Sequence, residues 1–109
     1  MNHELLDRDG ALVVVLSGDV DLDSSPEARR VLLDAVARGR RVLVDLAGVT
    51  YIDSSGVASL VESLQGARKA GTDLALVSVS EAALRVLQLA RLDRVFTIHA
   101  TLDEGLAAG

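Results

Sequence analysis

Residues 42–57 read VLVDLAGVTYIDSSGV, an apolar run followed by a cluster of small polar side chains. The run Val42–Leu46 is aliphatic and partly β-branched, which is typical of a strand buried on both faces. Residues 47–52 then predict a loop. A helix is expected to begin at Asp53 or Ser54, because apolar residues recur after it at one-turn spacing. The stretch therefore predicts a strand that leads into a helix.

The same alternation of strand and helix extends in both directions along the chain. The predicted elements are, in order, a strand at 3–7 joined by a hairpin turn to a strand at 12–16, a helix from Ser24 to near Gly39, the strand at 42–46, a helix from Asp53 or Ser54 to Gly71, a strand at 74–77, a helix after Ser80, an edge strand at 96–98 and a final helix after Thr101. This order predicts one α/β domain over residues 1–109, with a mixed, mostly parallel sheet of about four or five strands and about four helices packed on it.

Two of the predicted helix starts have the form of a capping box. Ser24 and Ser25 are two possible caps, with Pro26 in the first turn and Glu27 three residues after Ser24, and Thr101 is followed by Glu104. In such a box the hydroxyl and the glutamate satisfy free backbone N–H groups at the helix start. We therefore expect both side chains to cap their helices.

Composition excludes several classes of function. The 109 residues carry a net charge of −5 and only isolated basic pairs, so nucleic acid is not expected as a partner. The chain has no cysteine, and its two histidines lie near opposite ends, so neither a metal site nor a cofactor is expected. No apolar stretch is long enough to cross a bilayer, and the first residues do not resemble a signal peptide, which predicts a cytoplasmic protein without membrane insertion.

Two polar loops are expected to form a site, because ligands of such sheets bind at the carboxyl ends of the strands. One loop spans residues 18–24 and contains Asp21, and the other spans residues 50–56. If their strands are neighbours, Asp21 and the serines face one opening. Gly56 has no β-carbon, which would let another molecule approach the adjacent serine.

Each of these residues also has a purely structural interpretation. Asp53 can cap the first amides of the helix, and Ser54 and Ser55 can be helix-start residues and nothing more. Asp45 is expected to orient a loop by accepting a hydrogen bond. Tyr51 is expected to pack in the core or at the rim of the site.

Four segments resemble the successive signatures of STAS domains, and more narrowly those of bacterial anti-sigma factor antagonists. They are residues 16–21, 42–46, 51–57 and 92–96, of which the Asp-Ser-Ser-Gly stretch at 53–56 is the most specific. The resemblance implies that the chain binds an ATP-dependent serine kinase that is also an anti-sigma factor, and thereby frees a sigma factor. It further implies phosphorylation of Ser55, with Ser54 as the second candidate, reversal by a serine phosphatase, and a kinase-binding surface around Asp21, Asp53, Ser54, Ser55 and Gly56. The chemistry of the residues does not choose between the two serines, and the sequence leaves the oligomeric state open.

One position departs from the family pattern. Many relatives have a glycine before Leu92, where this chain has Arg91. A left-handed residue there is less favourable without glycine, which predicts a turn of another shape.

Three alternatives remain at this point. A serine hydrolase could combine Ser55 with Asp53 or Asp45 and His99, but the glycine spacing of a nucleophile elbow is missing. A phospho-aspartate receiver could use Asp45, but Lys69, the only lysine, falls within a predicted helix. The more serious alternative is a STAS subunit of a lipid-transport or stress-signalling complex without a phosphorylation switch.

Overall fold

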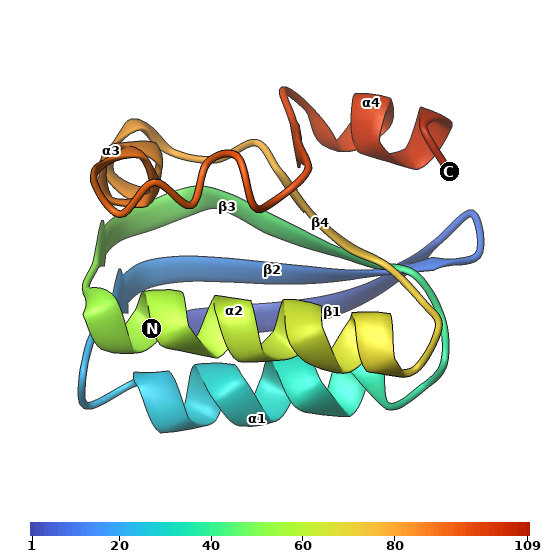
Figure 1. The fold of residues 1–109 in the computed structure, drawn as a ribbon, viewed down its shortest axis with the longest axis horizontal. Helices are drawn as coiled ribbons and strands as arrows, with labels where there is room; N and C mark the ends of the chain where they lie inside the picture. Colours follow the sequence, from blue (N-terminus) through green and yellow to red (C-terminus); the bar gives the residue numbers. More distant parts are fainter.

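The computed structural model describes residues 1–109 as a five-stranded sheet with four helices (Figure 1). The strands are β1 (Asn2–Arg8), β2 (Ala11–Val20), β3 (Val42–Ile52), β4 (Leu74–Val77) and β5 (Ile98–His99). The helices are α1 (Ser25–Val36), α2 (Ser54–Lys69), α3 (Glu81–Leu89) and α4 (Leu102–Ala107). The strand order is β1-β2-β3-β4-β5, with β1 antiparallel to β2 and all other neighbours parallel. The predicted fold class is confirmed.

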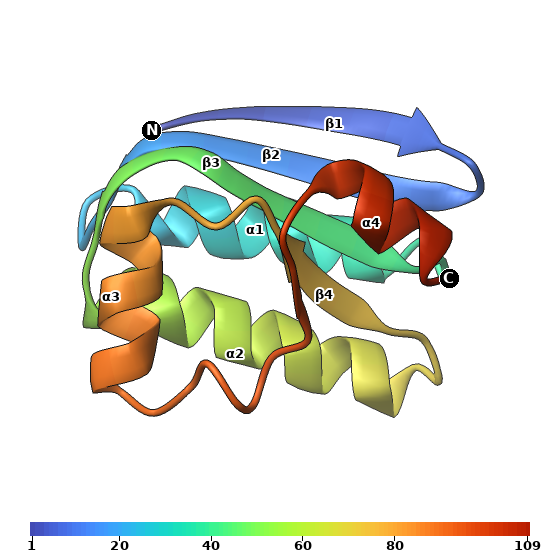
Figure 2. The same cartoon turned by 90° about the horizontal axis from the view of Figure 1, so that it is seen from above.

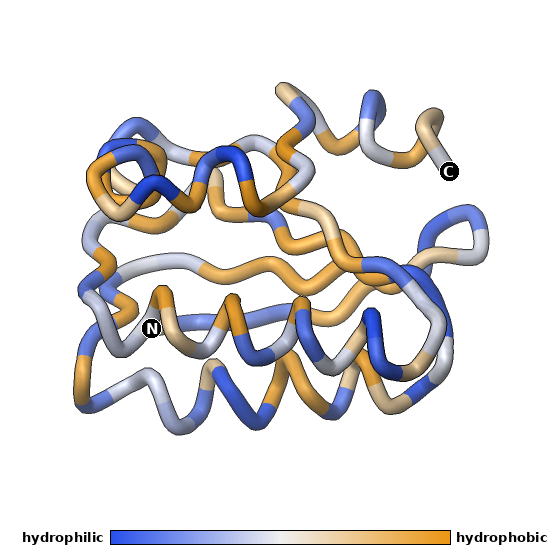
Figure 3. Tube along the Cα trace, viewed as in Figure 1, coloured by the Kyte–Doolittle hydropathy of each residue, from blue (hydrophilic) through white to orange (hydrophobic).

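The helices cover the two faces of the sheet unequally. In Figure 1, α1 and α2 lie side by side along one face and α4 lies across the other, while Figure 2 shows α3 at the end where β3 leads into α2. The larger core, which contains Leu16, Leu46, Leu60 and Leu87, joins the sheet to α1, α2 and α3. A smaller core of five buried residues lies under α4. Figure 3 shows the central strands as largely hydrophobic and the β1–β2 hairpin tip as hydrophilic.

The central strands are longer than predicted. β2 continues to Val20 and β3 to Ile52, so the prediction of a loop at 47–52 is wrong. The extensions pair with each other through two register shifts, in which Ser17 faces Gly48 and Gly18 faces Val49. Ser-Gly and Ala-Gly in the sequence therefore mark β-bulges inside strands, where the ladder bends but does not end.

Several predicted helix starts and stops are confirmed, but the first capping box is wrong. Ser80 and Thr101 cap α3 and α4 by accepting the N–H groups of Ala83 and Glu104. Ser24 holds the N-cap position of α1, as the predicted helix start requires, but its hydroxyl donates to the carbonyl of Asp19 at 2.9 Å and makes no capping hydrogen bond. Because the Ser24 hydroxyl is bound within the β2–α1 loop, it does not bind the first N–H groups of α1. α1 also ends at Val36, three residues before Gly39.

The remaining differences lie in the C-terminal third. The edge strand is Ile98–His99 instead of 96–98, because the ring of Phe96 is buried in the larger core. Arg91 adopts φ +59°, so the turn after α3 keeps the left-handed shape that the sequence argued against. The N–H of Leu92 donates to the carbonyl of Leu87 at 2.8 Å. This hydrogen bond closes the turn although Arg91, and not glycine, precedes Leu92.

Candidate functional site

The ends of β2 and β3 bring the two polar loops together, as expected for neighbouring parallel strands. The N–H of Asp53 donates to the carbonyl of Val20, and the hydroxyl of Thr50 donates to Asp19 at 2.8 Å. α2 begins directly after this junction. The start of α2 and the β2–α1 loop therefore form one continuous surface at the carboxyl edge of the sheet.

Asp53 is the N-cap of α2. Its Oδ1 accepts the N–H groups of Ser55 at 3.0 Å and Gly56 at 3.3 Å, and also the hydroxyl of Ser55 at 2.5 Å. The Ser55 hydroxyl is the main cause that lowers the pKa of the Asp53 carboxyl, with smaller contributions from the backbone N–H groups of Gly56, Ser55 and Leu22, while desolvation opposes them. The carboxylate is therefore ionised at neutral pH.

The two serines occupy different environments. Ser54 is exposed, whereas Ser55 is half-buried and its hydroxyl is bound to Asp53. This difference was not available from the sequence, where both residues stand at the helix start. A bound hydroxyl has a fixed direction, so Ser55 is the better oriented nucleophile and Ser54 the more accessible one.

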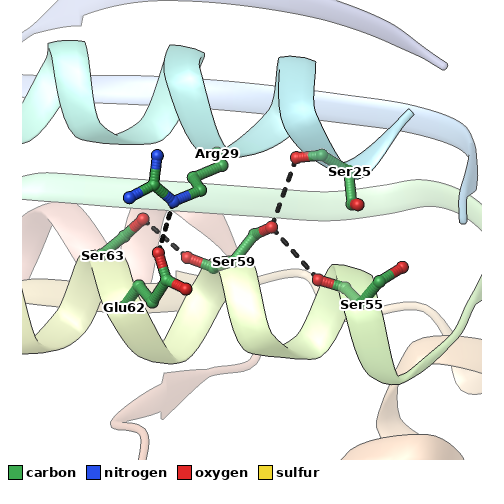
Figure 4. Close-up of polar contacts among 6 residues, drawn as sticks. All are labelled: Ser25, Arg29, Ser55, Ser59, Glu62 and Ser63. Atoms are coloured by element: carbon green, nitrogen blue, oxygen red, sulfur yellow. Dashed lines mark hydrogen bonds and ion pairs between the residues drawn. The ribbon is translucent and has the colours of Figure 1, made fainter. Parts of the chain in front are cut away.

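Hydrogen bonds among Ser25, Ser55 and Ser59, here called the polar seam, join the start of α2 to α1 (Figure 4). The hydroxyl of Ser59 donates to the carbonyls of Ser25, at 3.3 Å, and Ser55, at 3.2 Å. Figure 4 shows the Ser55 hydroxyl directed away from Ser59, and Arg29 bound to Glu62 farther along the same seam. Sequence reasoning missed Ser59, although a serine one turn after Ser55 was a visible signal of a small, polar helix contact.

A groove of about 310 Å³ runs beside this seam and ends at Ser55. Its walls come from the first turns of α1 and α2 and include Ser25, Pro26 and Arg29. The site is thus a shallow, open surface and not an enclosed pocket, which suits contact with a macromolecule better than binding of a small substrate.

Gly56 has an internal role in the structure. It is buried, and a β-carbon at this position would lie 2.7 Å from the carbonyl oxygen of Val20 and 2.7 Å from Ile52. Glycine therefore permits a close approach between α2 and the sheet, a role that sequence reasoning missed. The approach of another molecule to the serine beside Gly56 stays a prediction.

Asp21 has a structural role within its loop, and Tyr51 lies at the rim of the site, one of the two places expected for it. Oδ1 of Asp21 accepts the N–H groups of Asp23 and Ser24 at 3.1 Å each, so this carboxylate organises the loop from within. Tyr51 is 51% exposed beside the site, and Leu22 is 73% exposed in the β2–α1 loop. Two large apolar side chains therefore face solvent near the serines.

The structure does not bring together the residues that a serine hydrolase or a phospho-aspartate receiver would need. His99 lies on β5, two strands away from β3, and no hydrogen bond joins it to Ser55 or Asp53. Lys69 is the last residue of α2, at the opposite end from Asp53. Asp45 accepts the N–H of Ala47 at 2.9 Å, so the expected acceptor role is confirmed, but both residues lie inside β3 and the expectation that Asp45 orients a loop is wrong. No group of three or more histidine or acidic side chains is placed to hold a metal ion, and none of the four helices has the length and apolar character needed to span a membrane.

Comparison with known proteins places this site in a family. The STAS domain model matches residues 2–105, nearly the whole chain. The chain belongs to the STAS domain family. Among STAS proteins, it is 30% identical to an anti-sigma-B factor antagonist of Staphylococcus epidermidis, over 94% of this chain and 88% of that one. It is 26% identical to the anti-sigma-B factor antagonist of Bacillus subtilis, over 97% of both chains.

A solved structure has the same architecture. The crystal structure of an anti-sigma factor antagonist from Mycobacterium paratuberculosis matches with a TM-score of 0.90 and 29% identity, over 98% of this chain and 92% of that one. The resemblance stated from the sequence is confirmed at the level of the STAS family. These relatives are named as regulatory proteins and not as enzymes.

Proposed function

We propose that this STAS protein is an anti-sigma factor antagonist that binds an anti-sigma factor with serine kinase activity and is released when Ser55 is phosphorylated. The observation that carries the proposal is the Ser55 hydroxyl, held by the Asp53 carboxylate at the start of α2 on an open surface. The names of relatives that align over nearly the whole chain support the same function.

The local electrostatics explain how one phosphate can end binding. A phosphoserine adds about −1.5 to −2 charges at neutral pH. A helix start normally receives an anion on its free N–H groups, but those of Ser55 and Gly56 already donate to ionised Asp53. The phosphate must therefore displace a carboxylate or extend away from the helix toward the partner.

Either outcome weakens the complex. A partner that docks against the neutral hydroxyl would have to desolvate a dianion beside a second negative charge. A hundredfold loss of affinity requires only about 2.8 kcal/mol, which repulsion and desolvation at a contact surface readily supply. A serine phosphatase that removes the phosphate would restore binding.

Leu22 and Tyr51 supply the apolar part of the proposed docking surface. Leu22 is 73% exposed and Tyr51 is 51% exposed, and both lie near the polar start of α2. Exposed apolar side chains that flank a polar centre are typical of protein contact sites, where a few buried anchors carry most of the affinity. We therefore assign recognition to these two residues and switching to Ser55.

The first experiment is mass spectrometry of the protein isolated from its own cells, with the phosphate localised to Ser54 or Ser55. We expect modification of Ser55 in some growth conditions. Phosphate on Ser54 alone would show that Ser54, and not Ser55, is the phosphorylated residue. Absence of phosphate in every growth condition would contradict the proposed phosphorylation.

A second experiment tests the partner. Ser55→Ala and Ser55→Asp variants are used as baits in the same cells, and we expect only Ser55→Ala to retain an ATP-binding anti-sigma factor. Equal retention by both variants would contradict electrostatic release. Recovery of a membrane transport ATPase instead would support the alternative of a STAS subunit in a transport complex.

A further inference from the structure

Three acidic residues without an ion-pair partner lie at the end of β2 and in the loop that follows it. Residues 19–23, here called the acidic loop, contain Asp19, Asp21 and Asp23, and none of these takes part in the five ion pairs of the structure. Leu22, in the middle of the loop, is 73% exposed. The loop therefore presents an apolar side chain surrounded by negative charge.

The end of α3 presents the opposite charge around similar side chains. Residues 88–95, here called the basic end, contain Arg91, Asp93 and Arg94, a net charge of +1, and none of the three takes part in an ion pair. All three line an open hollow of about 480 Å³. Leu89 is 80% exposed and Val95 is 41% exposed beside it.

The backbone of Arg91 is a second sign that the basic end is more than a turn. Arg91 has φ +59°, a conformation that glycine adopts without strain and other residues adopt at a cost. Asp9 and Ser78 share this conformation, and such strain is often found at functional sites. At Arg91 the side chain that glycine would remove carries an exposed guanidinium.

We propose that the acidic loop of one molecule docks on the basic end of a second copy of this chain. The acidic loop, with three aspartates, and the basic end, with a net charge of +1, are opposite in charge, and each has exposed apolar side chains that such a contact would cover. Because Leu22 is one of them, self-pairing would compete with the docking of the partner under the proposed function. Figures 1 and 2 place both at the same end of the molecule, on either side of the start of α2. Two copies related by a two-fold axis can therefore form both contacts at once, and the pair is closed.

The pair is expected to be weak and salt-dependent. Each copy carries a net charge of −5, so the two repel each other at long range, and only the local contacts are attractive. Pairing that depends on exposed charges weakens as salt screens them. The oligomeric state should therefore depend on protein concentration and on ionic strength.

Sedimentation equilibrium of the full chain tests the proposal. From about 10 to about 500 μM, a range that brackets weak association, we expect the mass to rise toward that of a dimer and no further. Arg94→Glu and Asp23→Arg should each raise the dissociation constant at least about tenfold, by opposing like charges. Arg68→Glu is the matched control, because it makes the same change of charge at the other end of α2 and should raise the constant less than about threefold.

Mixing the two defective variants gives the sharper result. When Arg94→Glu and Asp23→Arg are combined, one contact is restored with its charges exchanged and the other is native, so a two-fold pair should re-form from two monomers. Thermal unfolding of each variant alone, followed by circular dichroism, shows whether it is folded. A monomer at every concentration, growth beyond the dimer, or no recovery on mixing would each overturn the proposal. The proposal would also be overturned if Arg68→Glu raised the dissociation constant as much as Arg94→Glu does.

Discussion

The hydroxyl of Ser55 donates to the carboxylate of Asp53, the same group that caps the first amides of α2. One oxygen, Oδ1, receives the hydroxyl and two backbone N–H groups. The proposed phosphate acceptor and the helix cap are therefore one hydrogen-bonded unit. Any change at the hydroxyl, whether substitution or phosphorylation, must alter the charge balance of the cap.

The first prediction concerns the pKa of Asp53 in Ser55→Ala. Because the Ser55 hydroxyl is the largest cause of the lowered pKa, its removal should move the pKa of Asp53 up toward the ordinary value of 3.8. Carbon-detected NMR titration of the Asp53 carboxyl measures this directly. Ser54→Ala is the control and should leave the titration unchanged, since no hydrogen bond joins Ser54 to this carboxylate. An unchanged pKa in Ser55→Ala would mean that the backbone amides alone set the charge state.

The second prediction compares two glycines of α2. A methyl group on Gly56 would meet the carbonyl of Val20 and the side chain of Ile52 at 2.7 Å each, so Gly56→Ala should destabilise the fold by about 1–3 kcal/mol through overpacking. At Gly66 the nearest atoms lie at 3.7 and 3.8 Å, so Gly66→Ala should stabilise it by up to about 1 kcal/mol, as alanine favours a helix. Urea unfolding of both variants measures whether each substitution lowers or raises the free energy of unfolding. Equal effects would show that helix propensity, and not contact with β2, governs Gly56.

The sequence predicted the order and type of the elements, because each apolar run has one dominant period and most helices have a recognisable first residue. It failed where side chains choose between local partners. Ser24 has the sequence form of a cap but binds within its loop, and Gly48 reads as a loop residue but lies inside a strand. Both outcomes depend on the pairing of β2 with β3, which no local pattern specifies. The different environments of Ser54 and Ser55 likewise arise from tertiary contacts.

The third prediction concerns the hairpin of β1 and β2. Asp7 binds Arg40 through both carboxylate oxygens, at 2.6 and 3.1 Å, and this contact lowers the pKa of Asp7 below 3.8 and raises that of Arg40. A carboxyl with a lowered folded pKa stabilises the fold above its unfolded pKa, and this contribution is lost as the pH falls through the folded value. Asp7→Asn should therefore unfold at lower urea than wild type at pH 7, and the gap should close below about pH 4.

The control for the hairpin is Asp73→Asn. Asp73 is exposed and belongs to none of the five ion pairs, so its removal should leave the urea midpoint nearly unchanged at both pH values. A gap between wild type and Asp7→Asn that persists at low pH would show that the effect does not come from the charge of Asp7, and so not from the ion pair with Arg40.

The last prediction concerns the turn after α3. Arg91 holds φ +59°, where an L-residue is disfavoured by about 1–2 kcal/mol, and glycine is not. Glycine also loses more backbone entropy on folding, so we expect Arg91→Gly to stabilise the chain by roughly 1 kcal/mol or less. Thermal unfolding measures the gain, and Arg94→Gly is the control because Arg94 has no positive φ. A gain in Arg94→Gly of equal size would point to relief of charge repulsion in the basic end, and a loss in Arg91→Gly would mean that the arginine side chain stabilises the turn it strains.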